Sequence, residues 1–181
     1  MALILVGKSA SGKDTIRTEL VKLGMQRVVS YTTRPRRPNE VDGVDYHFVS
    51  LDEFNKQNLF GVRKYTVAGG DTWYYGFQLG ELSANSVLIL DPLGLRDLKD
   101  VKDVSIVSFY IKVAADIRKQ RALNRGDKIN EVERRMKADE HDFFFIEPRV
   151  DFSINYSQGK DKIVARCIYD LYQNFIGGAS V

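Results

Sequence analysis

Residues 2–23 read ALILVGKSASGKDTIRTELVKL. The five apolar residues at the start have the length of a buried strand, and residues 13–23 carry one apolar stripe at helical spacing. Between them stands Gly7-Lys8-Ser9-Ala10-Ser11-Gly12-Lys13, a GxxxxGK pattern. Glycine at both ends lets backbone N–H groups turn toward a phosphate, while the helix N-terminus and the lysine side chain add positive charge. The stretch therefore predicts a strand, a phosphate-binding loop and a helix in direct succession.

The residue after the loop lysine departs from the usual pattern. Asp14 stands where a serine or threonine normally binds Mg²⁺. Its carboxylate can hold the metal through a water molecule or repel the phosphate, and the sequence leaves both alternatives open. Thr15 lies on a different face of the helix and is a poor substitute. The candidate ATP-binding residues of this segment are Gly7, Ser9, Ala10, Ser11, Gly12, Lys13, Asp14 and Thr15.

Strand-length apolar runs recur along the chain, at 2–6, 27–31, 86–91 and 104–113. The first, third and fourth are nearly continuous rather than alternating, as in central parallel strands that are covered on both faces. Helices are expected at 13–23, 114–124, 131–141 and 160–175. Strands that alternate with helices in this way predict an α/β fold with three layers, α/β/α, around a mostly parallel sheet.

Local signals indicate the bounds and faces of the later helices. Gly126 is expected to stop the helix over 114–124. Asn130 has the residue type of an N-cap, and Glu133 completes the pattern of a capping box. The last helix has an apolar residue at every fourth position, which predicts a buried stripe. The stripe consists of Ile163, Cys167, Leu171 and Phe175.

Length and composition are those of one globular domain. The chain has 181 residues, of which 44% are hydrophobic and 28% charged, and this argues against disorder. The net charge of +3 is too small to imply nucleic acid as a partner. No apolar segment is long enough to cross a membrane, and the N-terminus lacks the pattern of a secretory signal, so we expect a cytoplasmic protein. Cys167 cannot form an internal disulfide because it is the single cysteine, and its apolar surroundings predict a buried, inert thiol.

Residues 32–80 interrupt the alternation of strands and helices and read as a small, partly β excursion. The excursion opens with TTRPRRPNEVDGVDYHFV, which holds three arginines within four residues. Two prolines stiffen this segment and three acidic residues follow the arginines. The mixture favours a shaped pocket for one small anion over a track for a polyanion, because arginine forks clamp a phosphate and tyrosine hydroxyls complete its coordination.

The pattern SxTTRxxRxxExxGxDYxFV (30–49), downstream of a phosphate-binding loop, resembles the guanylate kinase family. The resemblance extends over most of the chain. It implies a single guanylate-kinase-like domain that transfers the γ-phosphoryl of ATP, with Mg²⁺, to a monophosphate acceptor, for which GMP or dGMP is the leading candidate. The implied parts are a P-loop core (about 1–31, 86–115 and 149–181), a nucleoside-monophosphate-binding region (32–80) and a helical lid (116–146).

The resemblance also assigns residues to the acceptor and to the adenine end of the donor. The acceptor's phosphate would be bound by arginines and tyrosines, its base would face a serine, and a strand-end aspartate would lie near the metal. These acceptor-binding residues are Ser30, Arg34, Arg37, Glu40, Tyr46, Tyr75 and Asp91. The family's late NDD motif is here Asn155-Tyr156-Ser157, so Asn155 is the remaining donor-binding residue of that motif.

Arginines on the two predicted lid helices suggest a site for the transferring phosphoryl group. Arg118, Arg121 and Arg125 stand at i, i+3 and i+7, on one helix face, and Arg134 and Arg135 follow on the next helix. In phosphoryl transfer such arginines close over the developing charge and neutralise it. The resemblance selects the catalytic set Lys13, Arg121, Arg125 and Arg135.

The chain departs from the family at the positions that read the base. Phe77, two residues after Tyr75, has no hydrogen-bonding group, and the family's glutamate falls on Lys64 or Thr66. Phosphate binding therefore looks intact while base reading looks altered. Two alternatives stay open: a guanylate-kinase-like kinase of a phosphosugar such as ribose bisphosphate, and a non-enzymatic guanylate-kinase-like binding module.

Overall fold

A computed structural model describes residues 1–67, 69–156 and 159–178. Ser157 of the predicted donor motif lies outside the described residues. Contacts between Cα atoms divide the chain into two compact units. The core unit comprises Met1–Arg27 and Ala84–Val181, and the inserted unit comprises Val28–Ser83. The inserted unit contains the predicted excursion over 32–80.

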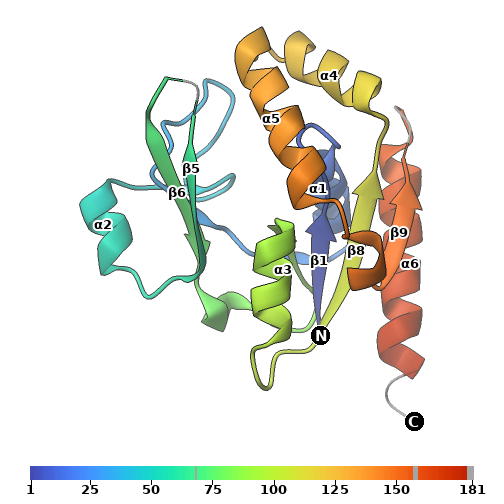
Figure 1. The fold of residues 1–181 in the computed structure, drawn as a ribbon. Helices are drawn as coiled ribbons and strands as arrows, with labels where there is room; N and C mark the ends of the chain where they lie inside the picture. The colour runs from blue at the N-terminus through green and yellow to red at the C-terminus, as the bar shows by residue number, and fades with distance from the viewer. Residues whose placement is uncertain (68, 157–158, 179–181) are drawn as a thin grey trace. The chain divides into compact units, whose positions relative to one another are not determined.

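The core unit is built on a parallel sheet of five strands, as the sequence predicts (Figure 1). The strand order is β2-β7-β1-β8-β9. The strands are β2 (Gln26–Arg27), β7 (Ser86–Leu90), β1 (Ala2–Val6), β8 (Ile106–Lys112) and β9 (Phe152–Asn155). The central strand β1 is buried along its whole length, because it pairs with β7 and β8 and is covered on both faces.

Helices cover both faces of this sheet, which confirms the three-layer fold. Leu3 and Leu5 of β1 pack in one cluster with Ile16 of α1 and Ile168 of α6. On the opposite face α3 contacts β1 and β7, and in Figure 1 α3 lies in front of the sheet and α1 behind it. The α-helices of the core unit are α1 (Lys13–Lys22), α3 (Pro92–Lys99), α4 (Ala115–Asn124), α5 (Ile129–Asp142) and α6 (Asp161–Gly178), with a short 3₁₀ turn, η2, at Glu147–Arg149.

The inserted unit has its own sheet, in the order β4-β3-β6-β5. Strands β3 and β4 are parallel, whereas β6 pairs antiparallel with β3 and with β5. Phe54 and Phe77 are the buried aromatic residues of this small core. The elements are β3 (Tyr31–Thr32), β4 (His47–Phe48), α2 (Leu51–Lys56), β5 (Phe60–Thr66), β6 (Thr72–Phe77) and the 3₁₀ turn η1 (Leu79–Glu81).

The predicted strand over 27–31 is wrong, because the structure divides this run between the two units. Strand β2 ends at Arg27 in the parallel sheet, and β3 begins at Tyr31 in the other sheet. Val28, between them, is 1% exposed. Val28 is the buried residue of this run and the other four are partly exposed, so the run by itself does not indicate how many strands it serves.

The predicted buried stripe of α6 is wrong for three of its four residues, and the fourth, Leu171, is partly buried against the core. Ile163 is 68% exposed, Phe175 is 40% exposed and Cys167 is exposed, not buried. The buried face consists of Val164, Ala165, Ile168 and Tyr172. The helix carries apolar residues on more than one face, so four-residue spacing alone does not identify the face that meets the sheet.

The predicted cap of α5 does not form. The helix begins at Ile129 after Lys128, so Asn130 lies inside the first turn. Glu133 pairs with Lys119 of α4 at 3.2 Å instead of closing a capping box. A capping box does form in the inserted unit, between Ser50 and Glu53 at the start of α2.

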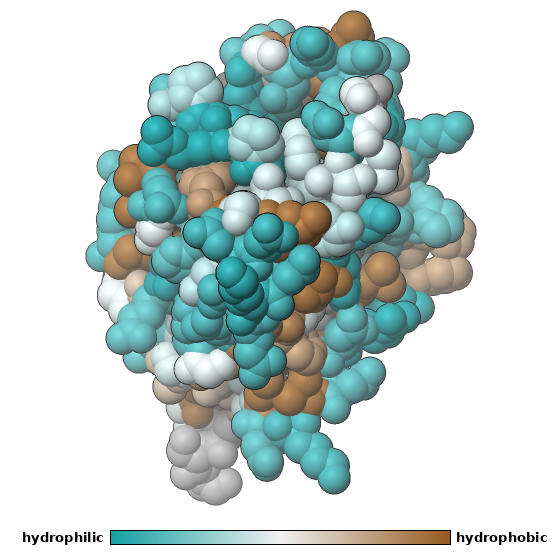
Figure 2. Space-filling view, turned by 90° about the vertical axis from the view of Figure 1, so that its left-hand side faces the viewer, coloured by the Kyte–Doolittle hydropathy of each residue, from teal (hydrophilic) through white to brown (hydrophobic). Residues whose placement is uncertain are grey.

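One face of the molecule is mostly polar. Figure 2 shows this face, on which hydrophilic residues predominate. Within the described part of the chain, no helix has the length and apolar character needed to cross a membrane.

Candidate active site

The phosphate-binding loop runs from the end of β1 to the start of α1. Gly12 has φ of 91°, and a Cβ atom there would lie 2.9 Å from Cε1 of Tyr156. At Gly7 a Cβ atom would lie 2.7 Å from Oγ of Ser11 and 3.0 Å from the carbonyl oxygen of Ile111. Both glycines of the motif are therefore required by close packing, and Gly12 also by its left-handed backbone. Ala10, between them, has φ of 59°.

Lys13 spans the inside of this loop. Its Nζ donates to the carbonyl oxygen of Gly7 at 2.5 Å, to that of Lys8 at 3.1 Å and to Oγ of Ser11 at 3.3 Å. Burial lowers the pKa of Lys13, and the nearby carboxylates of Asp14 and Asp139 partly oppose this effect. The ammonium group is thus held among the oxygen atoms of the loop, where it can meet a phosphate.

Asp14 and Thr15 lie in the exposed first turn of α1. The side chain of Asp14 is 73% exposed and accepts a hydrogen bond from Nη2 of Arg17 at 2.7 Å. Thr15 is exposed. The described residues contain no cluster of three His, Cys, Asp or Glu side chains that could hold a metal. Asp14 is the carboxylate next to the loop lysine and could hold a divalent metal through water.

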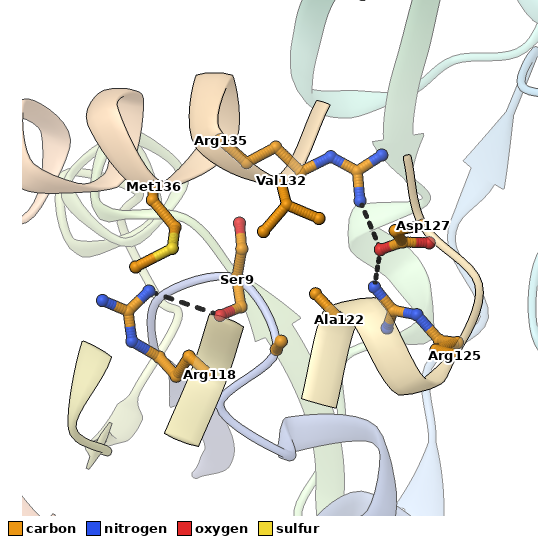
Figure 3. A pocket seen from close by; sticks show the side chains of 9 residues that line it. Ser9, Arg118, Ala122, Arg125, Asp127, Val132, Arg135 and Met136 are labelled. Atoms are coloured by element: carbon orange, nitrogen blue, oxygen red, sulfur yellow. Dashed lines mark hydrogen bonds and ion pairs between the residues drawn. The ribbon is translucent and has the colours of Figure 1, made fainter. Parts of the chain in front are cut away.

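The arginines of the predicted lid divide into two groups. Arg121 reaches the phosphate loop: its Nη1 donates to the carbonyl oxygen of Ser11 at 3.3 Å, and its guanidinium lies over the ring of Tyr156, 4.8 Å from the centroid. Arg125 and Arg135 both pair with Asp127 (Figure 3). Arg135 also meets Glu131 at 2.7 Å. Of the predicted catalytic arginines, Arg121 thus contacts the loop directly, whereas Asp127 holds Arg125 and Arg135.

Arg118 is buried rather than presented to solvent. It is 3% exposed and donates to the carbonyl oxygens of Val113 and Ser9, as well as to Asp139. Figure 3 shows its guanidinium beside Ser9, in a small pocket between the loop and helices α4 and α5. The arginine stripe predicted on α4 therefore includes one buried residue, Arg118.

Two residues of this site were not singled out by the sequence. Asp139 of α5 accepts hydrogen bonds from the backbone N–H and Oγ of Ser9, at 2.8 and 3.2 Å. The spacing in the sequence could have indicated Asp139, because Val132, Arg135 and Asp139 stand at i, i+3 and i+7 and share the face of α5 that points inward. Tyr156 packs against Gly12, is 6% exposed and donates its hydroxyl hydrogen to Asp161.

Asn155 and Asp91 end two of the parallel strands, at the edge of the sheet where the phosphate loop follows β1. Asn155 pairs with Lys112 in the ladder between β8 and β9 and is exposed. Asp91 follows β7 and caps α3, with Oδ1 accepting from the N–H of Gly94 at 2.6 Å. The structure thus shows a capping role for Asp91, at the sheet edge where open α/β folds bind ligands.

The predicted acceptor residues of the inserted unit form one cluster. Nη2 of Arg34 meets both carboxylate oxygens of Glu40, at 2.7 and 2.9 Å, and the backbone N–H of Arg37 donates to Glu40 at 2.9 Å. The guanidinium of Arg34 lies 5.5 Å from the ring centroid of Tyr46, and the rings of Tyr46 and Tyr75 lie 5.9 Å apart, edge to face. Five of the predicted residues are therefore brought together.

Ser30 stands at the start of the same sheet, where its carbonyl oxygen accepts from the N–H of His47 at 2.9 Å. Phe77 is 1% exposed and packs on Phe60 at 5.6 Å, so it belongs to the small core. Lys64 and Thr66 lie on β5, are exposed, and pair across the hairpin with Tyr74 and Thr72. Lys64 and Thr66 thus lie on the exposed part of this hairpin.

Comparisons with known proteins give one family. A family model described as guanylate kinase matches residues 1–65. The guanylate kinase of Symbiobacterium thermophilum is 32% identical over 148 residues, which cover 77% of this chain and 69% of that protein. The guanylate kinase of Rickettsia prowazekii is 30% identical over 181 residues, or 91% of each chain. The crystal structure of guanylate kinase from Anaplasma phagocytophilum has a TM-score of 0.67 at 19% identity and covers 96% of this chain and 85% of that one. The chain belongs to the guanylate kinase family.

Proposed function

We propose that this protein transfers the γ-phosphoryl group of ATP to GMP or dGMP. The observation that carries the proposal is the phosphate loop, in which Lys13 reaches three oxygen atoms across the loop and both glycines are required by their surroundings. The relatives that cover most of the chain are named guanylate kinase. A cytoplasmic location is part of the proposal.

On the donor side, the residues of the loop supply binding and charge rather than covalent chemistry. The loop amides and Lys13 would hold the outer phosphates, and Arg121, which contacts the loop, would neutralise charge as it develops on the transferring group. Arg125 and Arg135 are held by Asp127, so their part in the reaction would require this carboxylate to release them.

On the acceptor side, we infer that Arg37 contacts the phosphate and that Arg34 holds the site in shape. The side chain of Arg37 is 38% exposed, whereas that of Arg34 is 5% exposed and meets Glu40 with two hydrogen bonds. Tyr46 and Tyr75 would add hydroxyl groups to the coordination of the phosphate. Ser30 would face the base.

The metal is proposed to be Mg²⁺. When bound with the donor, it would supply charge neutralisation for phosphoryl transfer. Asp14 would hold it through water, because its carboxylate is exposed next to Lys13 and does not belong to a protein-only metal cluster among the described residues. Removal of the metal with a chelator should stop turnover.

A coupled assay of ADP release tests the proposal. The purified protein is given ATP and Mg²⁺ with GMP, dGMP, AMP, CMP or UMP, and with ribose bisphosphate in a separate arm. We expect turnover with GMP and dGMP. Turnover with ribose bisphosphate alone would show that the acceptor is a phosphosugar. No release of ADP with any acceptor would favour a binding module instead.

A further inference from the structure

A buried carboxylate of helix α5 contacts the phosphate loop. Asp139 of α5 is 8% exposed, and its two oxygen atoms accept from the backbone N–H and the hydroxyl of Ser9, at 2.8 and 3.2 Å. Arg118 of α4 donates to the same carboxylate at 3.1 Å. Asp139 and Ser9 are 130 residues apart in the chain, so the contact joins the second helix of the predicted lid to the loop.

The groups around Asp139 are those that bind a phosphate oxygen. A backbone N–H of a GxxxxGK loop, a hydroxyl group and a guanidinium are donors typical of phosphate sites. A carboxylate oxygen at 2.8 Å from the Ser9 nitrogen has the distance of a normal charged hydrogen bond. The side chain of Asp139 is thus an anion of the protein itself at one of the donors of the loop.

The negative charge of Asp139 makes its contact with Ser9 unfavourable when a triphosphate binds to the same loop. Burial raises the pKa of Asp139, while Ser9, Arg118 and Lys13 oppose the rise. Arg118 is 3% exposed, so it compensates the carboxylate in surroundings with little water. Phosphate groups brought to the same loop would meet a negative charge and would compete for the Ser9 N–H.

We propose that Asp139 is a determinant of donor affinity: its carboxylate competes with the donor's phosphates for the Ser9 amide and must leave that amide when a triphosphate binds. Arg118 then loses its carboxylate partner and becomes a donor for the incoming phosphate. The proposal rests on the proposed function only in assuming that the loop binds a polyphosphate.

The alternative is that Asp139 merely holds the loop in shape. The two possibilities predict changes of opposite sign when the carboxylate is removed. A competing anion lowers the affinity for phosphate, so its removal tightens binding. A structural tie orders the loop, so its removal weakens binding.

The experiment compares the binding of ATP and of tripolyphosphate by calorimetry. The variants are Asp139→Ala and Asp139→Asn, with Glu140→Ala as the matched control, because Glu140 is an exposed carboxylate one residue further along α5. A double variant, Arg118→Met with Asp139→Ala, guards against a fold weakened by an unpaired buried arginine. Thermal denaturation confirms that each variant is folded.

We expect Asp139→Ala to bind both probes on the order of 10-fold more tightly than the unchanged protein, with a smaller gain for Asp139→Asn. Glu140→Ala should change the affinity less than twofold. The double variant should lose the gain, because Arg118 no longer receives the phosphate. Since tripolyphosphate has no base or ribose, its equal response would assign the effect to the phosphates.

Equal or weaker binding of both probes by the folded Asp139 variants would overturn the inference and leave the proposed function standing. Tighter binding of ATP without tighter binding of tripolyphosphate would also overturn it. If neither the unchanged protein nor any variant bound either probe, both the inference and the proposed function would be refuted.

Discussion

The carboxylate of Glu40 accepts hydrogen bonds from the guanidinium of Arg34 and from the backbone N–H of Arg37. Burial by itself would raise the pKa of Glu40, but the hydrogen bonds from Arg34 and from the Arg37 amide outweigh burial, and the pKa is lowered. Both side chains of the pair with Arg34 are largely buried, at 5% and 15% exposed. At the scale of single residues, the cluster of Arg34 and Arg37 around Glu40, which we propose binds the acceptor, therefore depends on one ionised carboxylate.

The ion pair between Glu40 and Arg34 should make the stability of the fold depend on pH in the acid range. A glutamate whose pKa is lower in the folded state stabilises the fold above its ordinary pKa of 4.5, and the contribution is lost as the pH falls through the lower value. We expect Glu40→Gln to lower the free energy of unfolding by about 1.5–3 kcal/mol at pH 7. Urea denaturation at several pH values between 7 and 3 should show this difference shrinking in acid, and a constant difference would contradict the assignment.

Helix α6 shows how an element is placed by one of its faces. Ile168 is fully buried against the sheet, and the hydroxyl of Tyr172 on the same face accepts from the N–H of Asn85 at 3.1 Å and donates to the carbonyl oxygen of Met1 at 2.7 Å. Ile163, on another face of the same helix, is 68% exposed. The two residues are of the same type and lie in the same helix, so they differ only in their environment.

A matched pair of substitutions tests which face is buried. Ile168→Ala should lower the free energy of unfolding by about 2–5 kcal/mol, because it removes buried methyl groups and leaves a cavity. Ile163→Ala should change it by no more than about 0.5 kcal/mol. Urea denaturation of the two variants measures the difference, and a larger loss for Ile163→Ala would reverse the assignment of the two faces.

At the scale of the whole molecule, the two proposed phosphate sites belong to different units. The loop with Lys13 lies in the core unit, whereas Arg34, Glu40, Tyr46 and Tyr75 lie in the inserted unit. Each cluster is held by contacts within its own unit: Lys13 by the loop oxygens, and Arg34 by Glu40. Substitutions in the two units should therefore act on different substrates.

Steady-state kinetics separate the two sites. Lys13→Ala removes the charge that meets the donor's outer phosphates and should abolish turnover with every acceptor. Arg34→Ala should raise the KM for the acceptor on the order of 10–100-fold and leave the affinity for ATP unchanged. Arg36→Ala, an exposed arginine of the same segment, is the control and should change KM little. Weakened ATP binding by Arg34→Ala with a normal acceptor KM would show that the inserted unit serves the other ligand.

Local patterns in the sequence were enough for the parts of the protein that are continuous along the chain. The strand, loop and helix over 2–23 follow one another directly, and the glycines and the lysine of the loop act on atoms a few residues away. The segment with Arg34, Glu40 and Tyr46 was predictable for the same reason, since its members lie within 13 residues. The alternation of apolar runs and helices was enough for the layered α/β fold.

Only the tertiary structure decided the features that join distant segments. The run over 27–31 is divided between two sheets, and α6 buries Ile168 and Tyr172 rather than Ile163 and Cys167. The contact of Asp139 with Ser9 spans 130 residues. Spacing along a helix or strand shows which residues share a face, but which face is buried, and which charges meet there, depends on the surfaces that other segments present to it.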